Sequence, residues 1–188
     1  MSSALAADEV AFGKDSEQIT RSLRGLANLS YKQRKFDAAE ALFKRELSIE
    51  ENSAVLDSSA QAIILDSLGN VYFNTKRYDK AESVYEQEIK LLEAGTEQVR
   101  LTTALGELAA TYEANRKYDR AEALYLRTLS LEEKQFGPEN PMLEGPLWSL
   151  KELMVKLNRP TESAQFEARR QHIEQLLLQK NAAAAVTH

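Results

Sequence analysis

The sequence of 188 residues contains no cysteine and only two histidines. Without cysteine, the chain cannot form a disulfide, carry a thiol nucleophile or bind a metal through sulfur. The histidines, His172 and His188, have no nucleophile or second metal ligand near them in the sequence. A glycine-rich phosphate loop, a nucleophile elbow and a His-Glu-x-x-His pair are also missing. We therefore expect no catalytic residue, no metal site, no cofactor and no enzymatic activity.

Long hydrophobic runs and an excess of basic residues are absent too. No apolar segment approaches the roughly 18 residues that a membrane-spanning helix needs, so we expect no insertion into a membrane. The formal net charge is −5, from 24 basic and 29 acidic side chains that are interspersed along the chain. Because phosphate binding depends on concentrated Lys and Arg, this balance argues against nucleic acid as a partner.

The N-terminus is open to two interpretations. The segment Ala4-Leu5-Ala6-Ala7 resembles the small-residue end of a secretory signal, but the basic and apolar regions that should precede it are absent. One interpretation is a chain trimmed after a leader, which would place the protein in the periplasm or outside the cell. The other is a mobile N-terminal arm over residues 1–15 of a protein that is cytoplasmic by default.

A five-residue motif recurs along the chain. Its copies begin at Phe36, Tyr78 and Tyr118, with a divergent fourth copy at Pro160, so the spacings are 42, 40 and 42 residues. The first three copies read Phe-Asp-Ala-Ala-Glu, Tyr-Asp-Lys-Ala-Glu and Tyr-Asp-Arg-Ala-Glu. Each lies ten residues after a Leu-Ala or Leu-Gly pair and seven residues before another aromatic residue. A short helical pair cannot bury its apolar face alone, so the recurrence predicts stacked helical hairpins with one continuous core.

The repeated residues resemble the tetratricopeptide repeat, a helix-turn-helix unit with a small residue in its first helix and an alanine opening its second. The usual period is about 34 residues, and one further turn of about 3.6 residues in each helix gives about 41. This longer period, with Phe136-Gly137-Pro138-Glu139-Asn140-Pro141 after the third hairpin, resembles the kinesin-light-chain-like subclass, although Glu-Asn-Pro replaces its usual Asp-His-Pro. The resemblance implies an all-α fold, a right-handed α-solenoid over residues 16–180 with a C-terminal tail of residues 181–188. Its four repeats are expected near residues 16–51, 58–94, 97–135 and 142–179.

The residues of the core and the helix boundaries follow from the same alignment. We expect small residues where the two helices of a hairpin come closest, at Ala39, Ala81 and Ala121. The aromatic side chains of Phe43, Tyr85 and Tyr125 are expected in the core, beside Leu26, Leu68, Leu108 and Leu150. Helices are predicted near residues 16–34, 37–51, 58–75, 79–94, 97–115, 119–135, 142–157 and 161–179. Because proline disrupts a helix interior, Pro146 leaves open whether the seventh helix begins near residue 142 or at Gly145.

In this family the first helix of each hairpin lines the concave face, so the resemblance implies a peptide-binding groove at its outward positions. Those positions hold Arg21, Arg24, Asn28, Tyr31, Lys32, Asp66, Asn70, Phe73, Asn74, Thr103, Glu107, Ala110, Glu113, Trp148 and Glu152. Asn28 and Asn70 are equivalent in successive repeats, and a carboxamide can both donate to and accept from the backbone of an extended peptide. Trp148 fits either the groove or the core.

The leading prediction is a non-enzymatic interaction module that binds a peptide or protein segment in this groove. The alternative is a structural scaffold or homodimer that assembles through terminal helices. In the last predicted helix, Phe166, Ile173 and Leu177 are spaced to face the preceding hairpin, whereas Leu176 and Leu178 widen the apolar arc. Such a helix is either a polar cap of the solenoid or part of a homodimer contact through Leu176 and Leu178.

Overall fold

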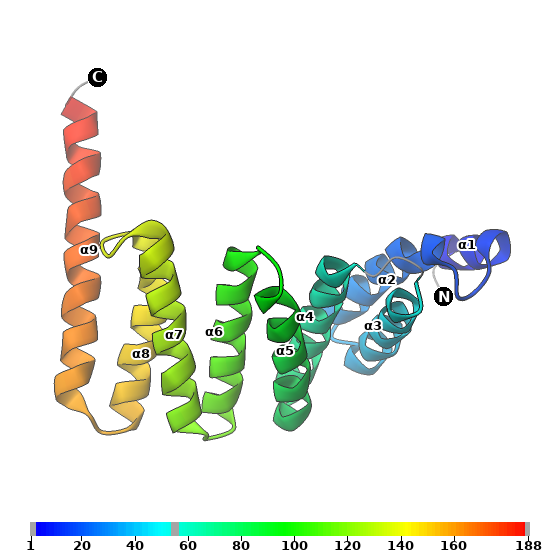
Figure 1. Ribbon diagram of the computed structural model, residues 1–188, viewed down its shortest axis with the longest axis horizontal. Coiled ribbons are helices and arrows are strands. Elements are labelled where there is room, and N and C mark those ends of the chain that lie inside the picture. Colours follow the sequence, from blue (N-terminus) through cyan, green and yellow to red (C-terminus); the bar gives the residue numbers. More distant parts are fainter. Residues whose placement is uncertain (1–2, 54–56, 187–188) are drawn as a thin grey trace. The chain divides into compact units, whose positions relative to one another are not determined.

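The computed structural model describes residues 3–53 and 57–186, and the regular secondary structure in these ranges is entirely helical, which confirms the predicted all-α class. The described α-helices are α1 (Ser3–Phe12), α2 (Thr20–Lys32), α3 (Phe36–Glu51), α4 (Ser58–Asn74), α5 (Tyr78–Glu93), α6 (Gln98–Ala114), α7 (Tyr118–Phe136), α8 (Glu144–Lys156) and α9 (Pro160–Val186) (Figure 1). Short 3₁₀ helices, η1 (Glu17–Ile19) and η2 (Pro141–Leu143), precede α2 and α8. The helices from α2 to α9 form one hairpin for each predicted repeat.

Each hairpin turns at one residue in the left-handed conformation, with φ between 56° and 60°: Arg34, Lys76, Arg116 and Asn158. In the first turn, the amide of Arg34 donates to the carbonyl of Tyr31 (2.8 Å) and the amide of Lys35 to that of Ser30 (2.9 Å). The other three turns repeat both bonds. This pair of bonds is the Schellman motif, which satisfies carbonyl groups at the end of a helix. The period of the sequence motif is therefore also a period of backbone conformation.

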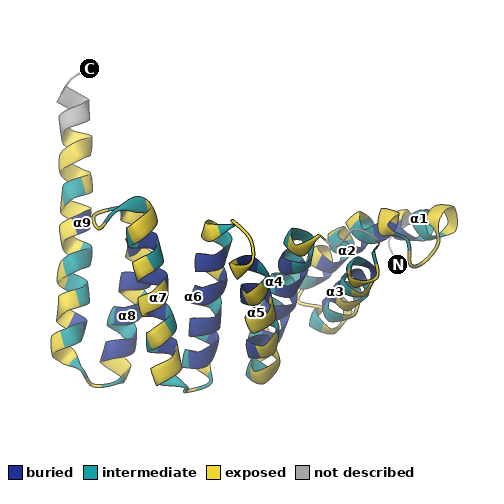
Figure 2. Cartoon of the chain, viewed as in Figure 1, coloured by how far each residue is buried: buried dark blue, intermediate teal, exposed yellow. Residues whose placement is uncertain are grey.

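The chain divides into two compact units, residues 1–104 and residues 105–188. In the first unit, α2 pairs with α3, α4 pairs with α5, and α3 packs against α4. The predicted core residues Ala39 and Ala81 are fully buried, as are the rings of Phe43 and Tyr85. Figure 2 shows the buried residues on the faces of these helices that meet their neighbours. Burial of these small and aromatic residues against each other holds the hairpins together.

Within the expected N-terminal arm, residues Ser3–Phe12 form the helix α1. Leu5 of this helix is buried in a cluster with Ile19, Leu23 and Ile49 of the first hairpin and its 3₁₀ turn. Glu9 forms an ion pair with Arg45 of α3 at 2.6 Å. One leucine and an ion pair therefore join this segment to the first hairpin, and the mobility of the arm stays a prediction.

In the second unit, α8 packs against both α7 and α9. Pro146 lies in the first turn of α8, which begins at Glu144. Amides in the first turn of a helix have no helical carbonyl to bind, so proline costs no hydrogen bond there. Ala121 and Leu150 are fully buried, as predicted. The expected tail of residues 181–188 is a continuation of α9 as far as Val186. Across the described residues, none of the helices combines the length and apolar character needed to cross a membrane.

Candidate functional site

A hollow of about 290 Å³ lies in the first unit, lined by Asn28, Tyr31, Phe43, Asp66, Ser67 and Asn70. Four of these residues, Asn28, Tyr31, Asp66 and Asn70, belong to the groove predicted from the sequence. The structure thus brings together side chains from α2 and α4 that are about 40 residues apart in the chain, one repeat period. Phe43 reaches the hollow from α3, and Ser67 is a lining residue that the sequence did not indicate.

The polar side chains of the hollow differ in how many hydrogen bonds they already make within the chain. The amide nitrogen of Asn70 donates to the backbone carbonyl of Asp66 (3.1 Å) and to its carboxylate (3.0 Å). The amide nitrogen of Asn74 donates to the Tyr31 hydroxyl and to the carbonyl of Asn70, both at 2.8 Å. Asn28 is exposed, and its side chain makes no hydrogen bond within the described residues. Asn28 can therefore offer both a donor and an acceptor to a ligand.

The predicted groove residue Arg24 is held by its own hairpin. Its Nε donates to Glu46 of α3 at 2.6 Å, and Glu46 is fully buried. Burial raises the pKa of Glu46 to about 7, against the opposing effect of Arg24. The guanidinium group therefore serves to balance a buried carboxyl group.

Other predicted groove residues of the first unit lie outside the hollow. Arg21, Lys32 and Thr103 are exposed. The ring of Phe73 packs edge-on against Tyr78, with 5.8 Å between ring centroids. None of these four lines the hollow, so their part in a groove stays a prediction.

A second buried carboxyl group, Glu88 of α5, lies close to the hollow. Its side chain is 2% exposed, and one of its oxygens has no hydrogen-bond partner within the described residues. Carboxylate oxygens of Glu88 and Asp66 lie within 4.8 Å of each other. Burial and then the charge of Asp66 raise the pKa of Glu88 to about 8, while Arg100 acts in the opposite direction. The signal for Glu88 was available in the sequence, since Glu46 and Glu88 share one repeat position.

The predicted residues of the second unit are engaged in local contacts. Glu113 accepts a hydrogen bond from the Tyr125 hydroxyl at 3.0 Å and forms an ion pair with Lys156. Glu152 forms an ion pair with Lys151 at 2.9 Å. Glu107 and Ala110 are half-buried. Trp148 is 52% exposed, which excludes the core, and its part in a groove stays a prediction.

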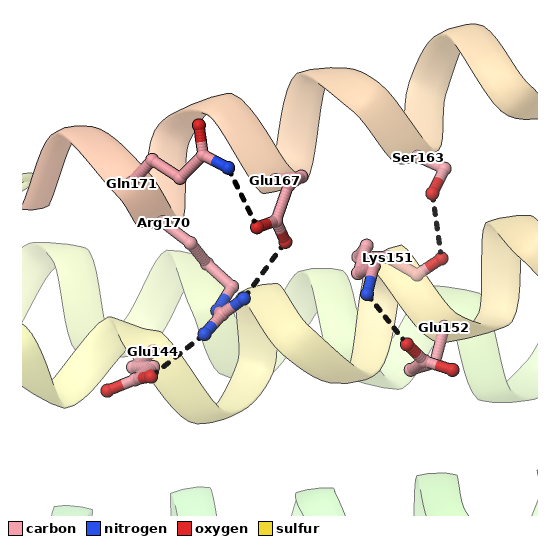
Figure 3. A network of polar contacts seen from close by, with 7 residues as sticks. All are labelled: Glu144, Lys151, Glu152, Ser163, Glu167, Arg170 and Gln171. Carbon is pink, nitrogen blue, oxygen red and sulfur yellow. Dashed lines mark hydrogen bonds and ion pairs between the residues drawn. The ribbon is translucent and has the colours of Figure 1, made fainter. Parts of the chain in front are cut away.

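The last hairpin is braced by the polar network of Figure 3. Arg170 of α9 reaches Glu144 of α8 at 3.0 Å and Glu167 at 2.9 Å. The Ser163 hydroxyl donates to the backbone carbonyl of Lys151 at 3.3 Å. These contacts fix α9 onto α8 over its first half.

Apolar residues of α9 are placed differently from the prediction. Ile173 is buried, as expected, but Leu177 is 40% exposed and the half-buried residue of the next turn is Leu176. The assignment of Leu177 to the packed face was wrong, because Leu176 follows Ile173 at a spacing of three rather than four residues. Leu178 is 61% exposed. A homodimer contact through Leu176 and Leu178 stays a prediction.

A family model described as tetratricopeptide repeat matches residues 64–97 and 104–139. These two segments of the chain are tetratricopeptide repeats. The matched segments contain most of the second and third hairpins, with their Schellman turns at Lys76 and Arg116. No curated protein matches the sequence significantly. The tetratricopeptide repeat fold is that of a protein–protein interaction module, and such scaffolds are generally not enzymes.

Solved structures share the fold of this chain. Putative kinesin light chain TPR-like repeats from Podosopora anserina match with a TM-score of 0.80 at 16% identity, over 90% of this chain and 82% of that one. Aspartyl phosphate phosphatase F from Bacillus subtilis matches with a TM-score of 0.74 at 11% identity, over 86% and 41% of the two chains. MamA from Desulfovibrio magneticus RS-1 matches with a TM-score of 0.65 at 15% identity, over 86% and 77%. These likenesses confirm the predicted α-solenoid class, a fold that the putative kinesin light chain repeats share.

Proposed function

We propose that the first unit binds an extended peptide or protein segment in the hollow between α2 and α4. The observation that carries the proposal is the presence of Asn28 and Asn70 on the same hollow, one from each of two successive repeats. Asn28 has its whole hydrogen-bonding capacity available, and both donors of Asn70 are directed to Asp66. The amide oxygen of Asn70 is thus left to accept from a peptide amide while Asn28 both donates and accepts.

The hollow also supplies a surface for a side chain of the bound segment. Phe43 belongs to the lining although it is almost fully buried, so the hollow combines an apolar aromatic residue with polar ones. Small-ligand and peptide sites commonly combine apolar surface with a few placed polar groups that determine orientation. The hollow of about 290 Å³ is large enough for one side chain and the adjoining backbone, not for a folded domain.

The proposal is tested by selecting peptides from a displayed random library on the wild-type chain and measuring their affinities by fluorescence anisotropy. Asn28→Ala combined with Asn70→Ala is expected to weaken the selected peptides at least tenfold, since two backbone hydrogen bonds are worth about 1.5 kcal/mol or more together. The matched control is Asn52→Ala with Gln87→Ala. Both carboxamides are exposed, Asn52 at the end of α3 and Gln87 on α5. Circular dichroism verifies that both double variants are folded. Equal affinities for all three proteins would refute binding in this hollow.

Assembly through the terminal helix is the second candidate function. It is favoured by adjacent exposed leucines, Leu177 and Leu178, on the part of α9 beyond its contacts with α8. In this alternative, chains associate through Leu176 and Leu178 and the protein acts as a scaffold. Light scattering on the wild type and on Leu176→Glu/Leu178→Glu separates the two functions. A monomeric wild type, or a dimer that both charges leave intact, eliminates this interface.

A further inference from the structure

The first two hairpins carry a pair of facing residues at the same repeat positions. In the first hairpin the pair is Arg24 on α2 and Glu46 on α3, joined at 2.6 Å. One period later the corresponding residues are Asp66 on α4 and Glu88 on α5, and their carboxylate oxygens lie within 4.8 Å of each other. The buried carboxyl group is therefore retained in the second hairpin, while the basic residue that balances it is replaced by an acidic one.

This replacement leaves the second pair without a cation at the equivalent place. Glu88 is almost fully buried and one of its oxygens has no hydrogen-bond partner within the described residues. The described cation that lowers the pKa of Glu88 is Arg100, whose effect is smaller than that of burial. Arg100 already forms an ion pair with Glu97 at 3.1 Å and donates to the backbone carbonyl of Ser59. A buried carboxyl group without a close partner is costly, and a cation from outside the chain would remove that cost.

Asp66 connects this buried pair to the hollow, since its carboxylate both faces Glu88 and belongs to the lining. Asp66 is the only ionisable acid or base of the lining apart from the Tyr31 phenol. A long basic side chain could lay its methylene groups on the Phe43 ring and direct its charged end to Asp66. An acidic side chain would meet the Asp66 carboxylate and is disfavoured by repulsion.

We propose that the hollow binds a lysine or arginine side chain of the bound segment. This side chain balances the charge of Asp66 and Glu88, as Arg24 balances that of Glu46 in the first hairpin. This inference rests on the proposed function and names the chemistry of the partner. The bound segment presents a basic residue to α4, and Asn28 and Asn70 hold the backbone on either side of it. The partner thereby completes a charge pair that the first hairpin completes for itself.

The test uses a probe that does not depend on finding the natural partner. The amide resonances of the isotope-labelled chain are followed by NMR while N-acetyl-Gly-Lys-Gly amide is added, and the norleucine tripeptide of the same shape serves as the uncharged comparison. We expect the lysine probe to shift resonances of residues 66–70 and of the Asn28 side chain. Because a charge-assisted hydrogen bond adds about tenfold or more in affinity, the norleucine probe is expected to bind at least tenfold more weakly.

Variants at one position separate this site from a general acidic surface. Asp66→Asn is expected to abolish the preference for lysine over norleucine. Asp66→Arg copies the first hairpin, supplies the cation within the chain, and is expected to prevent binding of the lysine probe. Glu51→Gln is the matched control, because Glu51 is an exposed carboxylate of the same unit outside the hollow. It should leave the preference unchanged, and circular dichroism confirms the folding of each variant.

Three outcomes would overturn the inference. The first is equal binding of the lysine and norleucine probes, and the second is a lysine preference that survives Asp66→Asn. The third is a set of shifts produced by calcium chloride and lost in Asp66→Asn, with no preference between the tripeptides, which would make the acidic pair a metal site. Selected peptides that need Asn28 and Asn70 but no basic residue would leave the proposed function standing while refuting this inference.

Discussion

The Tyr85 ring occupies the space that a side chain on Gly69 would need. A Cβ atom built on Gly69 would lie 2.4 Å from Cε1 and 2.5 Å from Cζ of Tyr85, far inside van der Waals contact. The ring is buried against α4, so it has little room to withdraw. The corresponding pairs are Ala27 with Phe43 in the first repeat and Ala109 with Tyr125 in the third, so glycine is required by the placement of the Tyr85 ring and not by the repeat or by tyrosine as such.

Gly69→Ala is therefore expected to destabilise the protein. Alanine is a better helix former than glycine by about 1 kcal/mol, but overpacking against a buried ring costs about 1–3 kcal/mol and should prevail. Gly25→Ala is the matched control, because nothing lies within 4 Å of a Cβ atom at Gly25 of α2. Urea denaturation should show a lower free energy of unfolding for the first variant and a higher one for the second. A stabilising Gly69→Ala would mean that the Tyr85 ring can move aside.

The left-handed turn at Lys76 makes a separate prediction about the backbone. A φ of 59° is unfavourable for a residue with a Cβ atom, so Lys76→Gly should raise the free energy of unfolding by up to about 1 kcal/mol. Lys76→Val should lower it by about 1–2 kcal/mol, because a β-branched residue tolerates this conformation least. Both variants remove the same exposed amine, so any common effect of the charge cancels in the comparison. Thermal melts that rank valine at or above glycine would contradict the assigned turn.

Glu40 predicts loss of stability in acid. Burial raises its pKa, but hydrogen bonds from Lys44, Arg77 and Tyr72 outweigh burial and lower the pKa to about 2, from 4.5. The unfolded chain then binds a proton before the folded one does as the pH falls. This contribution is present above pH 4.5 and disappears towards pH 2, with an upper limit of about 3 kcal/mol. Denaturation midpoints measured across this range should fall less steeply for Glu40→Gln than for Glu51→Gln, an exposed control.

Glu46 predicts the opposite dependence at higher pH. Its pKa is about 7 in the folded chain against 4.5 for the ordinary group, so between these values the folded state binds more protons. Stability from this group is therefore greatest below pH 4.5 and decreases as the pH rises to 7, by up to about 3 kcal/mol. Glu46→Gln should remove this part of the slope. An unchanged slope would show that Arg24 keeps Glu46 ionised throughout.

The periodic features of the molecule were predictable because they depend on local pattern. The motif copies at Phe36, Tyr78 and Tyr118 lie at the starts of α3, α5 and α7. Their alanines and aromatics are buried as predicted, since residue size and helical spacing determine which side chains can meet across a hairpin.

The unpredicted features depend on which side chains meet across two elements. The sequence predicts Arg24 as an exposed groove residue, but its side chain forms an ion pair with Glu46 on the next helix. The attachment of α1 depends on Leu5 and on the ion pair of Glu9 with Arg45. Hydrophobic periodicity in a short segment could not single out Leu5. The basic residues at the left-handed turns carry no glycine signal, so the Schellman motifs were visible only in the backbone.

The facing positions of Arg24 with Glu46 and of Asp66 with Glu88 recur in the later repeats as Gly106 with Thr128 and Trp148 with Arg170. Apart from the glutamate shared by the first two, these four pairs differ chemically. The alanine and aromatic positions beside them are kept in the first three repeats and become Ser163 and Glu167 in the fourth. Duplication of an ancestral hairpin would thus yield copies whose recognition chemistry can drift while their architecture is inherited. An exchange of these two side chains would then change the chemistry that a hairpin presents while leaving its backbone unchanged.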